Sequence, residues 1–451
     1  MNKGFWKHRR YIFLLFLLSF FILAPLIVLY TAGYRYNITT GTVLRTGILS
    51  AASTPKGAAV FIDNIPAGET PLIVKTIIPG VHIIKIEAEN YLPWQKNIRI
   101  ESRQTAFVTP NLLKNSPRET TFASSSENIL SISETSKAIY QNTETHTVSL
   151  FDLVNKKTTV LIEGSDISEE TENIQIVWSL NNDIALITLF TSESKNYNLF
   201  YTDTGIPYSL PALKDAEPIL SAWFETGRAD SLHFLKEDGL WEYKLSTKEL
   251  ALIGPSSVKQ SMWMGNDLFV LQNAGDFVSA GFLKGEATSI LAYLPQITNG
   301  QYTIIPAPGN RILITESTQN TISLINPQNT TNPLELQTKG MLPSFEPGGD
   351  RILYTDGFEI FLYTPYGNNR ETLTRISRPI TQLLWHPNHD WILFGTDTEL
   401  NALETFTTHG DRTSFPIAKG VLLKTIMQKD KKSLILLDHE DGINTVDLIE
   451  L

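Results

Sequence analysis

The apolar positions divide the chain into regions with different patterns. Residues 11–30 are apolar almost without a break, with Ser19 as the one frankly polar side chain. A helix of that length rises by about 30 Å, which matches the hydrocarbon core of a bilayer. From residue 47 onward, apolar and polar residues alternate in short runs bounded by turn residues, which predicts β-strands. The pattern therefore predicts a transmembrane helix at 11–31 and an all-β body after it.

The residues that precede the apolar segment indicate its orientation. Residues 1–10 contain four basic side chains and no acidic one. Because positive charge stays on the cytoplasmic side, we expect 1–10 to be a cytoplasmic tail and the body to lie outside the cytoplasmic membrane, as a single-pass protein. A cleaved signal peptide is the alternative, but its apolar region usually has about 7 to 15 residues and ends at a small-residue cleavage site. Neither condition is met well here.

A small β domain is expected next to the membrane. Residues 32–46 are polar and predict a linker, whereas 47–113 alternate strand and turn signals without a helical period. Within this region His82, Ile84 and Ile86 share one face of a predicted strand, so that face is expected to contribute to a core. On such a face His82 is expected to be a half-buried structural histidine and not a metal ligand.

The order of turns and strands in 47–113 resembles the PEGA domain, a module of bacterial and archaeal envelope proteins. The residues that carry the resemblance are Thr54-Pro55-Lys56-Gly57-Ala58, Val60-Phe61-Ile62-Asp63, Gly68-Glu69-Thr70-Pro71, Pro79-Gly80-Val81-His82 and Tyr91-Leu92-Pro93-Trp94-Gln95-Lys96. Asn64 and Asn90 stand where the family usually has Gly, and Asn tolerates a positive φ better than most residues. The resemblance implies a small β-sandwich-like module without a known catalytic centre.

A unit of about forty residues repeats through residues 114–451. Residues 345–354 align with 385–394, and 307–313 supply a third copy: an apolar strand, a turn rich in Pro, Gly and Asn, and a second apolar strand. Weaker copies are anchored at Ile129, Trp178, Trp223, Trp263 and Met427. The unit resembles the strand-turn-strand signature of TolB-like and WD40-like β-propellers, whose four-stranded blades have about 40 to 45 residues.

The repeat length favours eight blades over seven for residues 114–451. Eight blades would have about 42 residues each, and seven would need about 48. The last repeat ends after a third strand at 443–449, and residues 119–124 have strand composition. Because a propeller can remove an open edge by borrowing a strand from the other chain end, we predict that 119–124 pair with 443–449 and close the ring.

Composition and motifs limit the chemistry of the body. The 451 residues include no cysteine, which excludes disulfides and cysteine nucleophiles. The net charge of -10, without a basic footprint beyond the first ten residues, argues against a nucleic-acid partner. We found no phosphate loop, dinucleotide glycine pattern or nucleophile elbow in the sequence. We therefore assign no catalytic, cofactor-binding or metal-binding residue and expect no cofactor.

Two polar clusters and the tryptophans are given structural interpretations. His386, His389 and Asp390 align with a turn between two strands, and residues 438–442 lie at another hairpin, so both clusters are expected to be solvated turns. Most of the eight tryptophans track the repeat and are expected to be buried.

These features predict a membrane-anchored binding or scaffold protein of the cell envelope. The PEGA module and the propeller would bind an envelope protein, a peptide or a cell-wall glycan. A polysaccharide lyase or hydrolase with its site in the propeller channel is the alternative, and a purely structural role is a third. The chain has eight histidines, and His8 and His82 lie outside the propeller, which leaves few histidines that could act in catalysis there. We therefore expect the protein not to be an enzyme.

Overall fold

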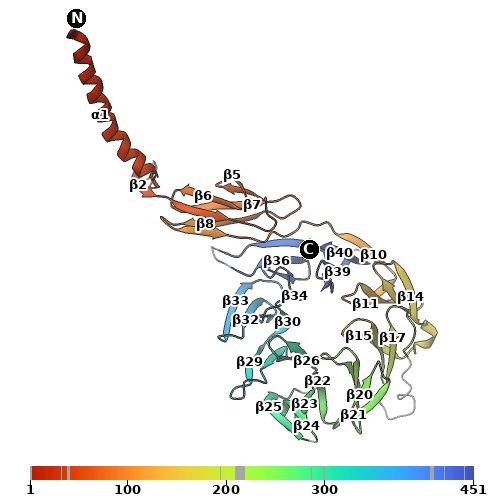
Figure 1. The fold of residues 1–451 in the computed structure, drawn as a ribbon. Coiled ribbons are helices and arrows are strands. Elements are labelled where there is room, and N and C mark those ends of the chain that lie inside the picture. Colours follow the sequence, from red (N-terminus) through yellow and green to blue (C-terminus); the bar gives the residue numbers. More distant parts are fainter. Residues whose placement is uncertain are drawn as a thin grey trace. The chain divides into compact units, whose positions relative to one another are not determined.

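The computed structural model describes residues 3–31, 33–37, 41–192, 194–208, 219–285, 287–297, 300–406, 411–420, 422–440 and 442–451. The chain forms two compact units (Figure 1). The first consists of Met1–Ser116 with Glu404–Ser414, and the second of Pro117–Leu403 with Phe415–Leu451. Each unit is described by itself.

The N-terminal helix α1 covers Lys3–Thr31 and contains the predicted apolar segment. Residues Tyr11–Thr31 have a mean hydropathy of 3.0, and none of the most apolar window is buried in the protein. The polar side chains within it are satisfied inside the helix, since the hydroxyl of Ser19 donates to the carbonyl of Phe16 and that of Thr31 donates to Ile27 and Val28. By length and composition α1 can cross a bilayer, a test that a secretion signal also passes.

A short hairpin follows the helix. Strands β1 (Tyr34–Asn37) and β2 (Thr42–Arg45) pair antiparallel, with Tyr34 opposite Arg45. The guanidinium of Arg45 lies 4.7 Å from the centre of the Tyr34 ring, a cation–π contact. The hairpin occupies the segment predicted as a linker, so that prediction is wrong for these strands.

Seven strands in two sheets form the β domain that follows. One sheet has the order β5-β4-β7-β8 and the other β6-β3-β9. Their bounds are β3 Gly47–Ala51, β4 Ala59–Ile62, β5 Ile65–Glu69, β6 Leu72–Ile77, β7 Gly80–Glu87, β8 Trp94–Ile100 and β9 Thr105–Val108. In β8 every second residue is buried, as expected for a strand with one face on a core. Asp63, Asn64 and Asn90 adopt positive φ, and both asparagines stand where the sequence analysis expected turns of this kind.

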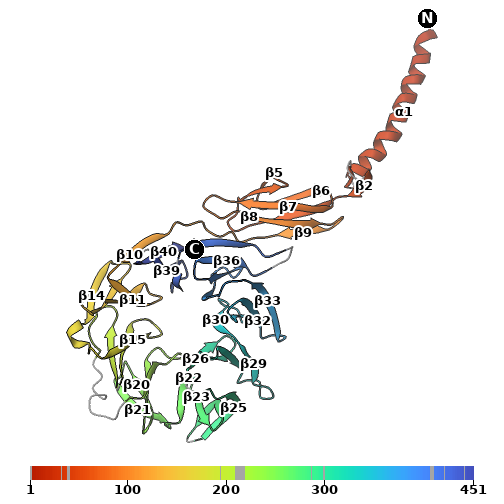
Figure 2. The same cartoon turned by 180° about the vertical axis from the view of Figure 1, so that it is seen from behind.

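Eight antiparallel sheets make up the second unit, arranged as a ring of blades (Figures 1 and 2). The first strands of blades 1 to 8 lie nearest the centre of the ring: β11 Glu127–Ile132, β15 Thr171–Trp178, β18 Ser221–Phe224, β22 Val258–Met264, β26 Tyr302–Ala307, β30 Met341–Phe345, β34 Gln382–Trp385 and β38 Leu422–Met427. The second strands are β12 Lys137–Asn142, β16 Ile184–Thr191, β19 Ser231–Lys236, β23 Asp267–Ala274, β27 Arg311–Glu316, β31 Ile352–Thr355, β35 Trp391–Gly395 and β39 Ser433–Glu440.

The outer strands complete the blades. The third strands are β13 Val148–Asp152, β17 Lys195–Tyr201, β20 Gly239–Lys244, β24 Phe277–Lys284, β28 Thr321–Ile325, β32 Glu359–Thr364, β36 Glu399–Glu404 and β40 Ile443–Glu450. The fourth strands are β14 Lys157–Ile162, β21 Glu249–Gly254, β25 Ala287–Pro295, β29 Leu334–Lys339, β33 Asn369–Arg375, β37 Ser414–Lys419 and, in blade 8, β10 Glu119–Ser124. In blade 2 the described strands number three, and residues 209–218 lie outside the described part of the chain.

The ring closes as the sequence predicts. Strand β10 pairs antiparallel with β40, with Glu119 opposite Leu448 and Ser124 opposite Asn444. Phe122 of β10 packs at 5.0 Å on the Phe151 ring of blade 1, in a core cluster shared by blades 8 and 1. The sheet count therefore supports eight blades instead of seven.

Buried charges reinforce the closing blade. The guanidinium of Arg118, directly before β10, donates to the Asp438 carboxylate at 2.8 Å and to that of Asp447 at 3.0 Å. It also donates to the carbonyl of Lys419 at the end of blade 7. The side chains of Asp438 and Asp447 are only 3% and 4% exposed. The prediction of a solvated turn at 438–442 is therefore wrong for Asp438.

The core lies between neighbouring blades. Buried apolar clusters join blade 1 to 2, 2 to 3, 3 to 4, 4 to 5, 5 to 6 and 6 to 7, in addition to the closing cluster. Four of the seven tryptophans with described side chains are buried, namely Trp94, Trp223, Trp385 and Trp391, and the other three are half-buried. Fewer tryptophans are thus fully buried than the sequence analysis expected.

Candidate functional site

The blade topology gives the ring two distinct ends. Because consecutive strands are antiparallel, the links between first and second strands all lie at one end, which we call the turn end. The links between second and third strands lie at the other end, the loop end. The repeated motif of the sequence falls in the turn-end links, so its residues meet at one face of the ring.

A cavity of about 340 Å³ lies at the turn end. It is bounded by the turns of four blades that are far apart in the sequence, blades 1, 6, 7 and 8. The lining residues are Glu134, Ser344, Phe345, Glu346, Pro347, Leu384, Trp385, Pro387, Met427, Gln428, Lys429 and Lys431. We name it the turn-end cavity.

Trp385 supplies a fixed aromatic wall of the turn-end cavity. The residue is 4% exposed, and its indole N–H donates to the carbonyl of Ser344 at 3.1 Å. The guanidinium of Arg351 lies 5.1 Å from the centre of the Trp385 ring. Since two residues of blade 6 hold the indole of blade 7, this wall is formed before any ligand arrives.

The carboxylate of Glu346 is neutralised within the protein. Arg351 donates to both carboxylate oxygens, at 2.8 and 2.5 Å, and Nδ1 of His389 lies 3.6 Å from one of them. The Arg351 hydrogen bonds are the main reason that the pKa of Glu346 is lowered, although burial opposes them. The ion pair fixes the turn of blade 6 against that of blade 7 and leaves little of the Glu346 charge for a ligand.

His386 is buried in the turn of blade 7, next to the cavity wall. It is 7% exposed, and its Nδ1 accepts the N–H of Asn388 at 3.2 Å. Burial lowers the pKa of His386 to about 4, so the ring is neutral at ordinary pH. The prediction that the cluster lies in an inter-strand turn is confirmed, but the prediction that it is solvated is wrong for His386.

Blade 8 contributes the lysines of the turn-end cavity. Lys429 and Lys431 are exposed, and in the described part of the chain neither forms an ion pair. The backbone N–H of Lys429 donates to the carbonyl of Glu134 at 2.9 Å, and the amide of Gln428 contacts the hydroxyl of Ser136. These bonds fix the backbone of the blade 8 turn to blade 1, while both ammonium groups remain in solvent.

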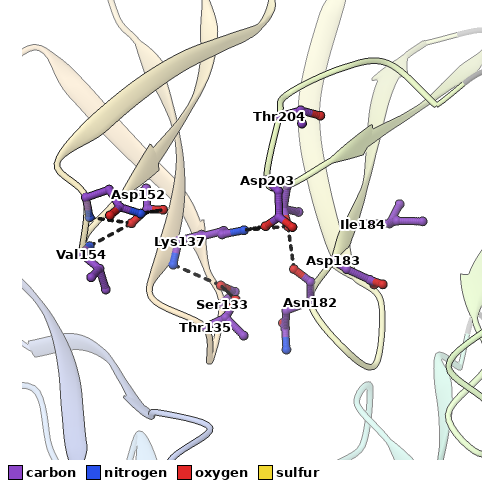
Figure 3. A network of polar contacts seen from close by, with 12 residues as sticks. Ser133, Thr135, Lys137, Asp152, Val154, Asn182, Asp183, Ile184, Asp203 and Thr204 are labelled. Carbon is purple, nitrogen blue, oxygen red and sulfur yellow. Dashed lines mark hydrogen bonds and ion pairs between the residues drawn. The ribbon is translucent and has the colours of Figure 1, made fainter.

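A polar strut joins blades 1 and 2 at the same end (Figure 3). The Lys137 side chain extends from the start of β12 across to blade 2, where its ammonium contacts the carboxylate of Asp203 and donates to the hydroxyl of Thr202 at 3.1 Å. Thr202 donates in turn to the carbonyl of Asn182 at 2.8 Å. Lys137 is almost buried, whereas the Asp203 side chain is 80% exposed. The strut holds the turns of blades 1 and 2 together. Because the Lys137 ammonium is already paired, it is not available to a ligand.

The loop end carries a second and larger cavity of about 720 Å³ between blades 1 and 2. We name it the loop-end cavity. Its polar lining consists of amides, hydroxyls, carboxylates and one imidazole: Asn128, Gln141, Asn173, Ser165, Ser168, Thr171, Glu169, Glu172 and His146. No lysine or arginine is among the described residues that line it. Its walls come from strands β11, β12 and β15 and from the links around them, and about half of the lining residues are exposed.

The most concentrated set of buried titratable groups is closed to solvent. Glu225, His233 and Glu242 are each at most 4% exposed. Glu242 accepts from Ser231 and from the indole of Trp263, both at 2.8 Å. Burial alone would raise its pKa, but these contacts and His233 lower the pKa of Glu242 to about 2. None of the three residues lines either cavity, so the set joins blades 3 and 4 and offers no open reaction site.

The sequence analysis named no site residue, so the turn-end cavity was missed. The repeat signature marked Phe345 and Trp385 as strand residues that precede turns at Glu346 and His386, but nothing in a linear pattern shows which turns lie side by side. Among the described residues, no group of three or more His, Asp or Glu side chains is placed to hold a metal ion. In the first unit His82 is half-buried, with hydrogen bonds of 2.7 Å to Asp63 and to the carbonyl of Ile78, as a structural histidine should be.

The family comparison identifies the domain next to the helix. Residues 46–116 match the model of the PEGA domain. This region contains strands β3 to β9 and agrees with the resemblance noted in the sequence. The chain therefore contains an N-terminal apolar helix, a PEGA domain and a β-propeller. No curated protein matches the chain at the threshold used.

Solved structures with a similar fold are mostly β-propellers. The Dos1 propeller is 10% identical and covers 75% of this chain and 94% of its own, with a TM-score of 0.48. Saccharomyces cerevisiae Sqt1 is 12% identical and covers 74% and 98%, with a TM-score of 0.46. An oligogalacturonate lyase in complex with manganese is 12% identical and covers 75% and 98%, with a TM-score of 0.38. At this identity the likeness concerns the fold alone and carries no functional argument.

Proposed function

We propose that this protein is a single-span membrane protein of the cell envelope that holds a PEGA domain and a binding propeller outside the cytoplasm. The observation that carries the binding role is the turn-end cavity, where four blades present a fixed aromatic wall beside lysines that form no ion pair within the described residues. Loops on a rigid ring position contacts at low conformational cost. The partner is an envelope protein, and the chain acts as a scaffold and not as an enzyme.

The proposed location rests on the helix and its flanks. Tyr11–Thr31 is long and apolar enough to span a bilayer, and the basic residues before it favour a cytoplasmic N-terminus. An uncleaved helix then anchors the body at the outer face of the cytoplasmic membrane. The acidic body has no cysteine, so engineered cysteines can report its side of the membrane without background.

A labelling experiment tests this location. Tyr366, which is 87% exposed, is replaced by cysteine in the full-length chain, and intact cells are treated with a membrane-impermeant maleimide. We expect Tyr366→Cys to be labelled in intact cells and to remain with the membrane fraction. The matched Gly4→Cys variant should be labelled only after the membrane is permeabilised. Labelling of the Tyr366→Cys variant only after permeabilisation would contradict the proposed orientation.

The polysaccharide-processing alternative would have to use the loop-end cavity, whose lining includes His146, Glu169 and Glu172, because the other acidic groups are closed off or paired. The buried Glu225, His233 and Glu242 set is closed to solvent, and the acid Glu346 is paired with Arg351. General acid–base catalysis requires a carboxylic acid or histidine within reach of the substrate. The aromatic wall and the exposed lysines of the turn-end cavity are suited to binding a partner.

A further inference from the structure

We propose that the turn-end cavity binds an acidic peptide segment in which an aromatic or aliphatic side chain stands beside carboxylates. This inference rests on the proposed binding role of the propeller and adds the chemistry of the partner. It follows from three properties of the cavity: its apolar wall, which of its charged groups are already paired within the protein, and which blades carry the remaining charged groups.

The apolar wall accepts one large apolar side chain. Trp385, Phe345, Pro347, Pro387 and Met427 line the cavity from three blades. The indole is held by its hydrogen bond to Ser344, so a side chain that packs on it meets a surface that does not have to be ordered first. A volume of about 340 Å³ fits a side chain and its neighbouring backbone, and not a folded domain.

Positive charge predominates among the charges that the cavity offers to a ligand. The carboxylate of Glu346 is held by Arg351 and faces His389, so its charge is compensated within the protein. Lys429 and Lys431 have exposed ammonium groups without an ion pair in the described part of the chain. The blade 8 turn, residues 429–432, contains three lysines and one aspartate in a protein whose net charge is -10. Such a local basic turn attracts carboxylates and disfavours basic segments.

The remaining carboxylate gives the ligand a direction. Glu134 lines the cavity from blade 1, and its backbone carbonyl accepts the N–H of Lys429. Because this bond places Glu134 beside the blade 8 turn, its carboxylate disfavours a peptide that continues over blade 1, so the peptide runs from Trp385 to the blade 8 lysines and ends there. The geometry therefore points to an acidic flank on blade 8 and an apolar anchor between blades 6 and 7.

Fluorescence anisotropy with the full-length protein in detergent micelles tests this inference. The probe is the fluorescein-labelled nonapeptide Gly-Ser-Asp-Glu-Phe-Glu-Asp-Ser-Gly at low ionic strength. One control peptide carries Asn and Gln in place of Asp and Glu, and the other carries Ser in place of Phe. We expect saturable binding of the probe, at least about tenfold weaker binding of each control peptide, and weaker binding as salt is added, because the lysines are exposed.

Charge-reversal variants locate the binding. Combining Lys429→Glu with Lys431→Glu should weaken the affinity for the probe peptide by about 100-fold, because both attractive charges become repulsive. Lys284→Glu reverses the charge of one exposed lysine of blade 4 outside the cavity and should alter affinity by less than about twofold.

Four outcomes would overturn the proposal: no binding of the probe, equal binding of the uncharged peptide, equal affinity in the cavity variant and Lys284→Glu, or a change of oligomeric state in the cavity variant without peptide binding. The last outcome would assign the cavity to a second copy of the chain. Correct labelling of the Tyr366→Cys variant in any of these cases would leave the proposed location standing, so the two failures are distinguishable.

Discussion

The turn-end and loop-end cavities lie on the same ring but differ in how their walls are held. At the turn end, Trp385 and His386 are buried parts of blade packing, and the wall is fixed by hydrogen bonds between blades. At the loop end, the walls come from three strands and the links around them, and about half of the lining residues are exposed. The smaller, turn-end cavity is therefore the better preorganised for ligand binding. A ligand gains affinity when the site need not be ordered on binding.

The two ends also differ in charge. The turn-end cavity presents Lys429 and Lys431, whereas the described lining of the loop-end cavity has Glu169 and Glu172 and no lysine or arginine. A partner that carries carboxylates is therefore attracted to one end and repelled from the other. The predictions that follow test whether the turn end is rigid and whether the closed ring sustains that rigidity.

The largest effect is expected at the ring closure on which both ends depend. Arg118→Ala leaves Asp438 and Asp447 buried without their cation, so the free energy of unfolding should fall by about 4 kcal/mol. Arg375→Ala removes an exposed ion pair with Glu359 and should cost less than about 1 kcal/mol. Chemical denaturation of the full-length protein in detergent measures both. Equal losses would mean that the Arg118 contact does not hold the ring closed.

A somewhat smaller effect is expected from the aromatic wall of the turn end. Trp385→Ala removes a buried side chain shared by blades 6 and 7, which should lower the free energy of unfolding by about 3 kcal/mol. Leu130→Ala at the loop-end cavity removes a half-buried side chain and should cost about 1 kcal/mol. The comparison of the two ends fails if both substitutions shift the denaturation midpoint alike.

Acid should weaken the turn end through His386. Burial holds the folded-state pKa of His386 at about 4, whereas the unfolded chain titrates near 6.5. As pH falls through about 6.5 the unfolded state binds the proton first, so this contribution to stability is present above pH 6.5 and is lost progressively toward pH 4. We expect a loss of about 2 kcal/mol at pH 5 relative to pH 8.

A variant isolates this contribution. His386→Gln introduces the residue that follows the first strand of blade 8, Gln428, and cannot be protonated in this range. Between pH 8 and pH 5, the unfolding free energy of the variant should fall by less than that of the wild type. An unchanged pH profile in His386→Gln would show that other groups cause the acid sensitivity.

The smallest effect is expected at the strut of blades 1 and 2. Asp203→Asn removes the charge that Lys137 contacts, but the Asp203 side chain is 80% exposed and water screens the pair. The loss in unfolding free energy should be below about 1 kcal/mol. A loss as large as that of Arg118→Ala would mean that the difference in exposure does not determine how much each ion pair stabilises the ring.

Much of the fold was predictable because its signals are local. The alternation of apolar residues marked the strands, and the missing fourth strand of the last repeat predicted the pairing of β10 with β40. Turn positions were also predictable, since Asn182, Asn310 and His389 adopt the positive φ that such links require. The hairpin of β1 and β2 was not predicted, although its four-residue strands are no shorter than β4, which was.

The site was less predictable because it is assembled from distant turns. Glu346 and His389 stand 43 positions apart in the sequence, yet their side chains lie 3.6 Å apart. Asp438 looked like a surface turn residue, because nothing local to it indicates that Arg118 reaches it. Sequence periodicity defines which residues occupy turns, whereas burial and pairing between blades depend on the closed ring.

Site-specific photo-crosslinking in intact cells tests the central claim most directly. A benzophenone amino acid replaces Pro387 at the turn-end cavity or Asn128 at the loop-end cavity, each with and without the combined change of Lys429 and Lys431 to Glu. The account predicts a light-dependent adduct with an envelope protein from position 387 that disappears with the charge reversal, and none of that adduct from position 128. An adduct from position 128 alone, or one from 387 that survives the charge reversal, would contradict it.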